Sequence, residues 1–123
     1  MNYVNLNYSS KEIDFIAKHV AAMRYCDFHS KSPKELAALS ATHTKLLDKL
    51  KSQSTKITKT NLVTMLNALQ NISAFINAGI IPLNDLFPEQ DISEPEYTVQ
   101  LRNAFLFLHP YCCELGFYFE VQL

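Results

Sequence analysis

The sequence contains very little glycine and no tryptophan. Its two glycines are Gly79 and Gly116. It therefore lacks the glycine-rich loops that bring backbone N–H groups against a phosphate, which excludes the nucleotide-binding enzyme folds that depend on such loops. With 123 residues the chain is also too short to hold a cofactor domain beside a substrate domain. We expect residues 1–123 to form a single helical domain that needs no cofactor.

Cysteine and long apolar runs are scarce as well. The three cysteines are Cys26, Cys112 and Cys113, an odd number with two adjacent residues, which is a poor disulfide framework and is typical of reduced thiols. The first ten residues have neither the basic nor the apolar segment of a secretory signal. Residues 60–84 carry no charge, but asparagine and glutamine interrupt the apolar run that a membrane span requires. These features predict a cytoplasmic protein without a membrane segment.

Two N-capping signals in the first half of the chain predict two helices. Residues 9–12 have the form of a capping box, and the apolar stripe behind them extends to about Phe28. Ser32 followed by Pro33 is a stronger signal, and a second helix is expected from Pro33 to about Lys51. Its apolar stripe consists of Leu36, Leu39, His43, Leu46 and Leu50. This three-four spacing indicates that one face of the helix lies along a neighbouring element.

The second half of the chain predicts two more helices separated by a proline-rich loop. Apolar residues over 62–76 recur at helical spacing and define a third helix, which Gly79 should end. Residues 80–95 hold three prolines and several acids, and favour a loop with at most one helical turn. A capping signal at Ser93 begins the fourth helix, and Pro110 should end or kink it.

The two ends of the chain are expected to be strands. In residues 117–123 apolar side chains alternate with polar ones at the two-residue period of a strand, and residues 4–8 do so more weakly. Because a lone strand leaves its backbone unpaired, we expect the two ends to pair. The polar residues 52–60 should be a plain connection. The predicted fold is mainly α (α+β): a compact four-helix domain with a small β-ribbon that pairs the N- and C-terminal strands.

Charge is divided unequally between the two halves. Residues 1–60 hold nine lysines and one arginine against five acids, whereas residues 61–123 hold one arginine against seven acids. The basic group comprises Lys45, Lys49, Lys51, Lys56 and Lys59. The acidic group comprises Asp85, Glu89, Asp91, Glu94 and Glu96. Two such groups either steer partners, including a second copy head to tail, or neutralise one another within the monomer.

The third predicted helix has an unusual polar face. Its members are Thr60, Thr64, Asn67, Gln70, Asn71 and Asn77. A solvent face normally carries lysine and glutamate, whereas the centres of protein interfaces are depleted in charge. This face, with Asn67 and Asn71 near its middle, is therefore predicted to contact a partner. The alternative is that the helix is central and enclosed by its own domain.

One segment resembles a helix-turn-helix. Residues 35–39 look like the first helix of such a motif and residues 45–47 like part of its recognition helix, which implies DNA binding with the downstream lysines on phosphates. The competing interpretation is one uninterrupted helix, because residues 40–44 contain no strong helix breaker. The chain has a pI near 6.4 and only two arginines for bidentate base contacts, which does not favour a sequence-specific DNA reader.

Cysteine and histidine offer one candidate metal constellation. Cys26 with His29, and His109 with Cys112 or Cys113, together supply two thiolates and two imidazoles, a ligand set that zinc accepts. The flanking sequence has none of the glycine-containing knuckles of common zinc sites, so no metal is predicted. The chain also has no nucleophile motif and no recognisable acid–base pair, and no enzymatic activity is expected.

Together these observations predict a non-catalytic protein-binding module of the immunity, inhibitor, antitoxin or adaptor type. It would act through its charged patches and its uncharged helix face, with another protein as partner and self-association left open. The candidate partner-binding residues are Lys45, Lys49, Lys51, Lys56, Lys59, Asn67 and Asn71. The alternative is a small DNA-associated regulator that uses the helix-turn-helix-like segment at residues 33–51, with nucleic acid as its partner.

Overall fold

The chain is mainly helical with one small antiparallel sheet. The computed structural model describes residues 2–23 and 32–119. Their elements are, in chain order, β1 (Tyr3–Asn5), α1 (Glu12–Ala22), α2 (Pro33–Lys51), β2 (Lys56–Thr58), α3 (Lys59–Asn77), α4 (Leu83–Leu86) and α5 (Glu94–Glu114). The predicted class is confirmed. Residues 24–28, over which the first helix was expected to continue, lie outside the described residues.

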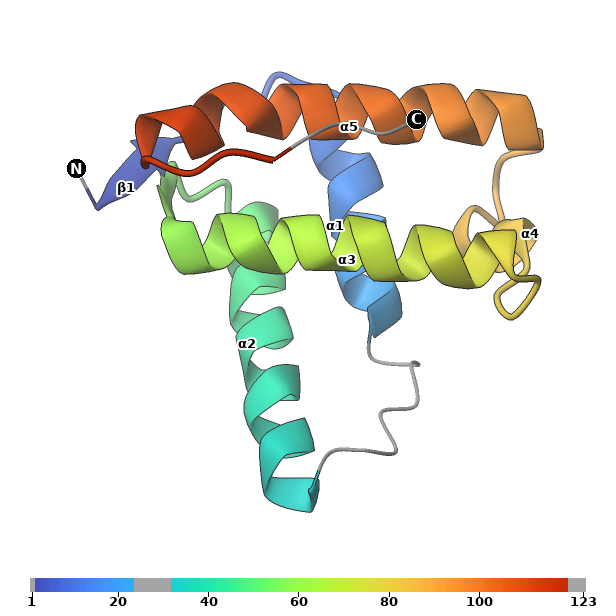
Figure 1. Ribbon diagram of the computed structural model, residues 1–123, viewed down its shortest axis with the longest axis horizontal. Helices are drawn as coiled ribbons and strands as arrows, with labels where there is room; N and C mark the ends of the chain where they lie inside the picture. Colours follow the sequence, from blue (N-terminus) through green and yellow to red (C-terminus); the bar gives the residue numbers. More distant parts are fainter. Residues whose placement is uncertain (1, 24–31, 120–123) are drawn as a thin grey trace.

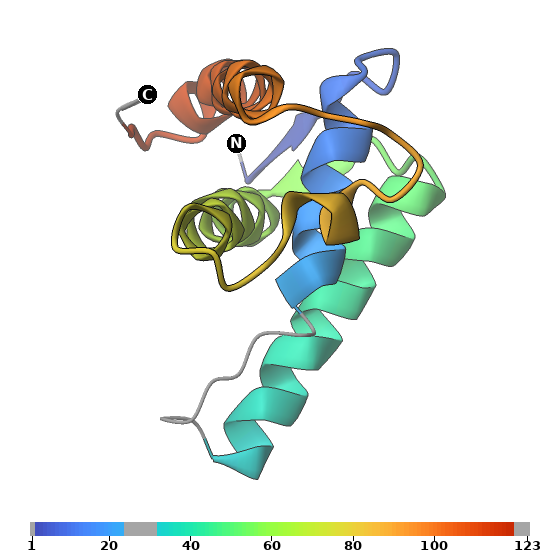
Figure 2. The ribbon, with the colours of Figure 1, turned by 90° about the vertical axis from the view of Figure 1, so that its right-hand side faces the viewer.

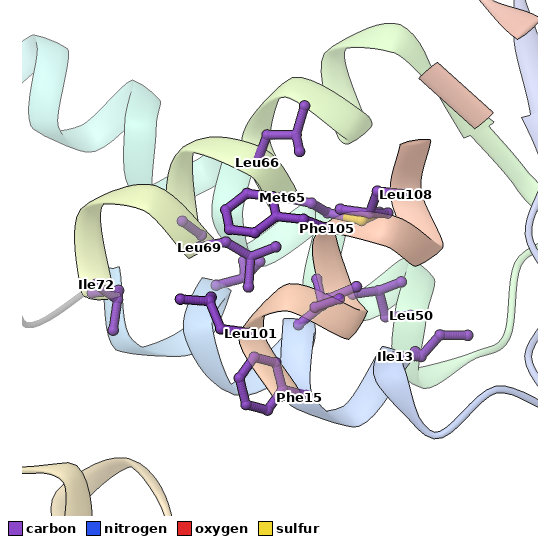
Figure 3. Close-up of a cluster of buried hydrophobic side chains, with 14 of the residues drawn as sticks. Ile13, Phe15, Leu50, Met65, Leu66, Leu69, Ile72, Leu101, Phe105 and Leu108 are labelled. Atoms are coloured by element: carbon purple, nitrogen blue, oxygen red, sulfur yellow. The ribbon is translucent and has the colours of Figure 1, made fainter. Parts of the chain in front are cut away.

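Helices α3 and α5 lie side by side and run in opposite directions, and α1 crosses behind them (Figure 1). Helix α1 contacts α2, α3 and α5, so it is the element around which the others pack. Figure 3 shows the result, in which Leu69 of α3, Leu101 of α5 and Phe15 of α1 belong to one cluster of buried apolar side chains. The apolar stripes of the predicted helices therefore meet in one core, as burial of apolar surface requires.

Helix α2 is one uninterrupted helix, so the helix-turn-helix interpretation of residues 35–47 is wrong. No glycine or proline interrupts it after its first turn, and the Thr42 hydroxyl donates to the carbonyl of Ala38 along the helix. Only its second half is buried. Leu46 is 0% exposed, whereas Leu36 in the same apolar stripe is 37% exposed. The first half extends beyond the other helices (Figures 1 and 2).

The small sheet pairs different segments from those predicted. Strand β1 pairs with β2, with Val4 opposite Ile57, and not with residues 117–119, the described part of the predicted C-terminal strand. Residues 52–60 were expected to be a connection because they are polar. A three-residue strand is too short to show alternation, and its one apolar side chain, Ile57, is fully buried. That burial, with Val4 beside it, fixes the sheet to the core.

The C-terminal alternation has a different cause from strand pairing. Residues 117–119 form no strand, and residues 120–123 lie outside the described part of the chain. Phe119 packs on the rings of Phe105 and His109 in α5, and Phe117 is also partly buried, whereas Tyr118 between them is 77% exposed. An extended segment lying on a helix buries every second side chain just as a sheet strand does. The two-residue period of residues 117–119 therefore results from burial of one side of an extended segment.

Pro110 does not end α5, which continues to Glu114. A proline inside a helix removes one backbone hydrogen bond and crowds the preceding turn. Leu108 and Cys112 on either side of Pro110 are both 0% exposed, and the Tyr111 hydroxyl accepts a 3.1 Å hydrogen bond from the backbone N–H of Asn7. Core packing on both sides of the proline therefore holds the last turn in place. Gly116, at φ +84°, follows the helix end.

Side-chain caps begin three of the four long helices. Ser32 accepts from the N–H of Glu35, Ser93 from that of Glu96, and Thr58 forms a reciprocal capping box with Asn61. The capping box expected at residues 9–12 is wrong. Helix α1 begins at Glu12 after Lys11, with no side-chain cap.

We expect Ser93→Ala to lower the free energy of unfolding by about 1 kcal/mol, because it removes the acceptor for an N-terminal amide of α5. Ser9→Ala is the matched control. The Ser9 hydroxyl donates to Asn7 and caps no helix, so its removal should change stability by less than about 0.5 kcal/mol. Urea unfolding followed by circular dichroism measures both, and equal losses would contradict the observed helix starts.

Candidate functional site

The basic group gathers at the end of the molecule that holds the sheet. Lys45, Lys49 and Lys51 lie in the second half of α2, Lys56 lies in β2 and Lys59 begins α3 (Figure 1). Because α2, β2 and α3 follow one another closely in the chain, they bring together charges that are spread over fifteen residues of sequence. The result is a surface rich in lysine at one end of α3.

Three of these lysines also have contacts within the chain. Lys49 Nζ donates 3.0 Å hydrogen bonds to the carbonyl of Lys56 and to Oδ1 of Asn61. Lys56 Nζ lies 4.6 Å from the centre of the Tyr3 ring, and Lys59 Nζ lies 5.3 Å from that of Phe117. A lysine ammonium group over an aromatic ring is attracted to the face of the ring and stays at the protein surface. Lys45 and Lys51 are exposed and carry the remaining positive charge of the group.

The acidic group gathers at the opposite end. Asp85 lies in α4, Glu89 and Asp91 follow it in the loop, and Glu94 and Glu96 begin α5. Helix α3 connects the two ends of the molecule, and its 19 residues span about 28 Å. The basic and acidic groups therefore do not face one another within the monomer, which leaves both available to partners. Two acids in the first turn of α5 also favour its helix dipole.

The uncharged face of α3 lies on the surface between these two ends. Asn67, Gln70, Asn71 and Asn77 are exposed, together with Val63, which is 39% exposed. Figure 2 looks along α3 and shows α1 and α2 on one side of it and α5 above it. In the part of the chain that the structure describes, the opposite side of α3 carries no other helix. Among residues 2–23 and 32–119, α3 is therefore not enclosed on this side.

Sequence reasoning missed two members of this exposed face. Val63 and Ala74 are apolar or small and were not included with the amides, yet both are exposed. Val63 lies four residues before Asn67 and Ala74 lies four residues after Gln70, and this spacing is the signal that would have placed them on the same face. The α3 outer face is defined here as Thr60, Val63, Asn67, Gln70, Ala74 and Asn77.

Only His109, Cys112 and Cys113 of the candidate zinc ligands lie among the described residues. Cys26 and His29 lie outside the described residues. Cys112 is buried, whereas the half-buried Cys113 has its Sγ 3.7 Å from Nδ1 of His109. Burial, with the neighbouring Cys113 thiol, raises the pKa of Cys112 to about 11, so this sulfur stays a neutral thiol. Within residues 2–23 and 32–119, no three histidine, cysteine or acidic side chains are placed to hold a metal ion.

A buried polar pair joins α1 to α5. Nδ1–H of His19 donates to the Phe15 carbonyl at 2.8 Å, so Nε2 accepts from the Tyr97 hydroxyl at 2.7 Å. Burial lowers the pKa of His19 to about 4, and burial also raises the pKa of Tyr97. Both side chains are thus held neutral with their hydrogen bonds satisfied. The rings of Phe15 and Phe87 pack around them, so the pair joins the two helices inside the core.

Of the three surface hollows beside α1 in the described part of the chain, the two largest lie against α4 and α2. One of about 520 Å³ lies between α1 and α4 and is lined mainly by alanine, isoleucine and leucine, with Lys18 and Asp85 at its edge. The other, of about 680 Å³, lies between α1 and α2. The second hollow is lined by Asp14, Lys18, Asp48 and Lys51 together with apolar side chains.

Comparison with protein-family models, with curated proteins and with solved structures finds no match to this chain. The class of protein is therefore defined by the fold and surface alone: a mainly helical chain with one two-stranded antiparallel sheet. None of the described helices combines the length and the apolar character needed to cross a bilayer.

Proposed function

We propose that this protein acts without catalysis, by binding another protein through the α3 outer face and the charged groups at its two ends. The observation that carries the proposal is the exposure of a face of α3 that has no charged residue from Thr60 to Asn77. Protein interfaces have centres depleted in charge and rims that are polar. The α3 outer face corresponds to such an uncharged centre, and the basic and acidic groups at its two ends correspond to the polar rim.

The charged ends would orient the partner, because complementary charge increases the association rate and fixes the register of a complex. We propose a binding module of the immunity, inhibitor, antitoxin or adaptor type. The uninterrupted α2 removes the motif on which the DNA-binding alternative rested. Protein binding is therefore the function proposed.

An affinity capture tests the proposal. The tagged chain is incubated with extract of its native host, with and without nuclease, and captured proteins are purified and titrated back against the chain. We expect a stoichiometric protein that survives nuclease and whose binding is weakened at least tenfold by Asn67→Lys. The matched control is Ser40→Lys, which adds the same charge on the exposed part of α2. Recovery of nucleic acid with nuclease-sensitive proteins would overturn the proposal.

The basic group predicts a second effect on the purified complex. Lys45→Glu should raise the dissociation constant about three- to tenfold and reduce its salt dependence, because exposed charge pairs contribute roughly 1 kcal/mol or less. Lys34→Glu makes the same change near the other end of α2, away from the sheet, and should have little effect. Isothermal titration at two salt concentrations measures both variants. Equal effects at the two positions would show that the basic group is no part of the contact.

A further inference from the structure

The α3 outer face has the spacing of a helix–helix seam. Its six residues, Thr60 to Asn77, follow one another in alternating steps of three and four, which keeps them in line along one side of the helix. This line lies opposite the side that α3 buries against α1 and α5. A second helix packed along such a line would find knobs and holes over the whole length of α3.

The order of residues along this seam is complementary to itself in the reverse direction. When two copies of α3 are placed antiparallel about the midpoint between Asn67 and Gln70, Asn67 of one copy lies opposite Gln70 of the other. In the same register, Val63 lies opposite Ala74. A branched side chain thus meets a small one, and amides meet amides that can exchange hydrogen bonds. Thr60 and Asn77 form the outermost layer.

The charged groups favour the same orientation. The basic group lies at the N-terminal end of α3 and the acidic group lies beyond its C-terminal end. Antiparallel packing places the basic end of each copy over the acidic end of the other, whereas parallel packing would place like charges together. The two charged groups of one chain are separated by the length of α3. A second copy of the chain in antiparallel orientation therefore supplies the opposite charge to each group.

We infer that the α3 outer face binds a second copy of this chain, with the two α3 helices antiparallel about a two-fold axis. This inference rests on the proposed function and names the partner of the same face. A two-fold axis uses one surface twice and closes the assembly at a dimer. The amides at the centre of the seam specify register at a cost in affinity, so we expect a dimer that dissociates in the micromolar range.

Analytical ultracentrifugation of the purified chain from about 5 to 500 μM brackets that affinity range. We expect a monomer–dimer equilibrium whose dissociation constant rises at least tenfold for Asn67→Lys, which places two like charges beside the symmetry axis. Ser40→Lys should leave the equilibrium unchanged. Asn67 is exposed in the monomer, so circular dichroism of the variant should match that of the parent chain. A monomer at all concentrations, or a dimer indifferent to Asn67→Lys, would overturn the inference.

Disulfide cross-linking tests the orientation independently of folding effects at Asn67. Chains with Val63→Cys are mixed with chains with Ala74→Cys under mild oxidation, and peptide mapping identifies the linked positions among the native cysteines. The antiparallel seam predicts links between positions 63 and 74 in the mixture. It predicts none between two copies of position 63, which would lie about 16 Å apart along the axis. Links between two copies of position 63 would show a parallel pair and overturn the proposal.

The two proposals fail in different ways. A chain that stays monomeric but captures another protein through the α3 outer face overturns the second copy as partner and leaves the proposed protein-binding function. A chain that neither self-associates nor captures a protein overturns both.

Discussion

Lowering the pH from 6.5 to 4 is expected to reduce the free energy of unfolding by about 3 kcal/mol through His19 alone. In the unfolded chain His19 has its ordinary pKa of 6.5, whereas burial lowers its pKa to about 4 in the folded protein. Between pH 6.5 and pH 4, His19 is therefore protonated in the unfolded state and mostly neutral in the folded state. The contribution of the neutral histidine is complete above pH 6.5 and is lost as the pH falls toward 4.

Urea unfolding at several pH values between 7 and 4 measures this effect. The comparison is with His19→Gln, which removes the titrating ring but keeps an amide within reach of the Tyr97 hydroxyl. The parent chain should lose about 3 kcal/mol more than the variant over this range. Parallel curves for the two proteins would show that His19 is not held neutral by burial.

Leu46→Ala is expected to lower the free energy of unfolding by about 2–5 kcal/mol, because Leu46 is 0% exposed and its removal leaves a cavity in the core. Leu36→Ala makes the same change ten residues earlier in the same stripe of α2. Leu36 is 37% exposed and lies in the part of α2 that extends beyond the other helices, so its loss should be under about 1 kcal/mol.

Chemical denaturation at pH 7 compares the two leucine variants directly, since helix propensity changes equally in both. A loss at Leu36 as large as that at Leu46 would contradict the half-buried arrangement of α2. Leu50→Ala extends the series, because Leu50 is 6% exposed and should resemble Leu46.

Long helices were predictable from the sequence because each has an apolar stripe at helical spacing, and three of them also have a local signal at one end. The second and fourth predicted helices have Ser32 and Ser93 as their N-caps, as observed, since a serine cap with proline in the first helical turn acts through local backbone geometry. Gly79 ends α3 for the same local reason, with φ of +76°. Such features depend on a few neighbouring residues and need no knowledge of the remainder of the chain.

Features that depend on distant contacts were not predictable. Strand β2 is three residues long, and only the position of Val4 beside Ile57 makes it a strand. Pro110 continues a helix because residues on both sides of it are buried elsewhere in the core. Periodicity also could not tell a strand from an extended segment on a helix at residues 117–119. In each case tertiary packing decided between local alternatives of similar free energy.

The candidate site was predictable in its chemistry but not in its layout. The absence of charge along α3 was visible in the sequence, and so were the two charged groups. Their placement at opposite ends of one helix follows from chain direction and packing, which no local pattern reports. The exposure of Val63 likewise depends on which side of α3 faces α1 and α5.

The two halves of α2 differ in the free energy needed to open their backbone hydrogen bonds. Hydrogen bonds near Leu46 can open only with the core, and their opening costs the global free energy of unfolding. Those near Leu36 are held by the Ser32 cap and by helix propensity, which are worth a few kcal/mol at most. The first turns of α2 can therefore unwind and re-form while the domain stays folded. Local unfolding at this end becomes a low-lying excited state of the native protein, accessible to any ligand that prefers it.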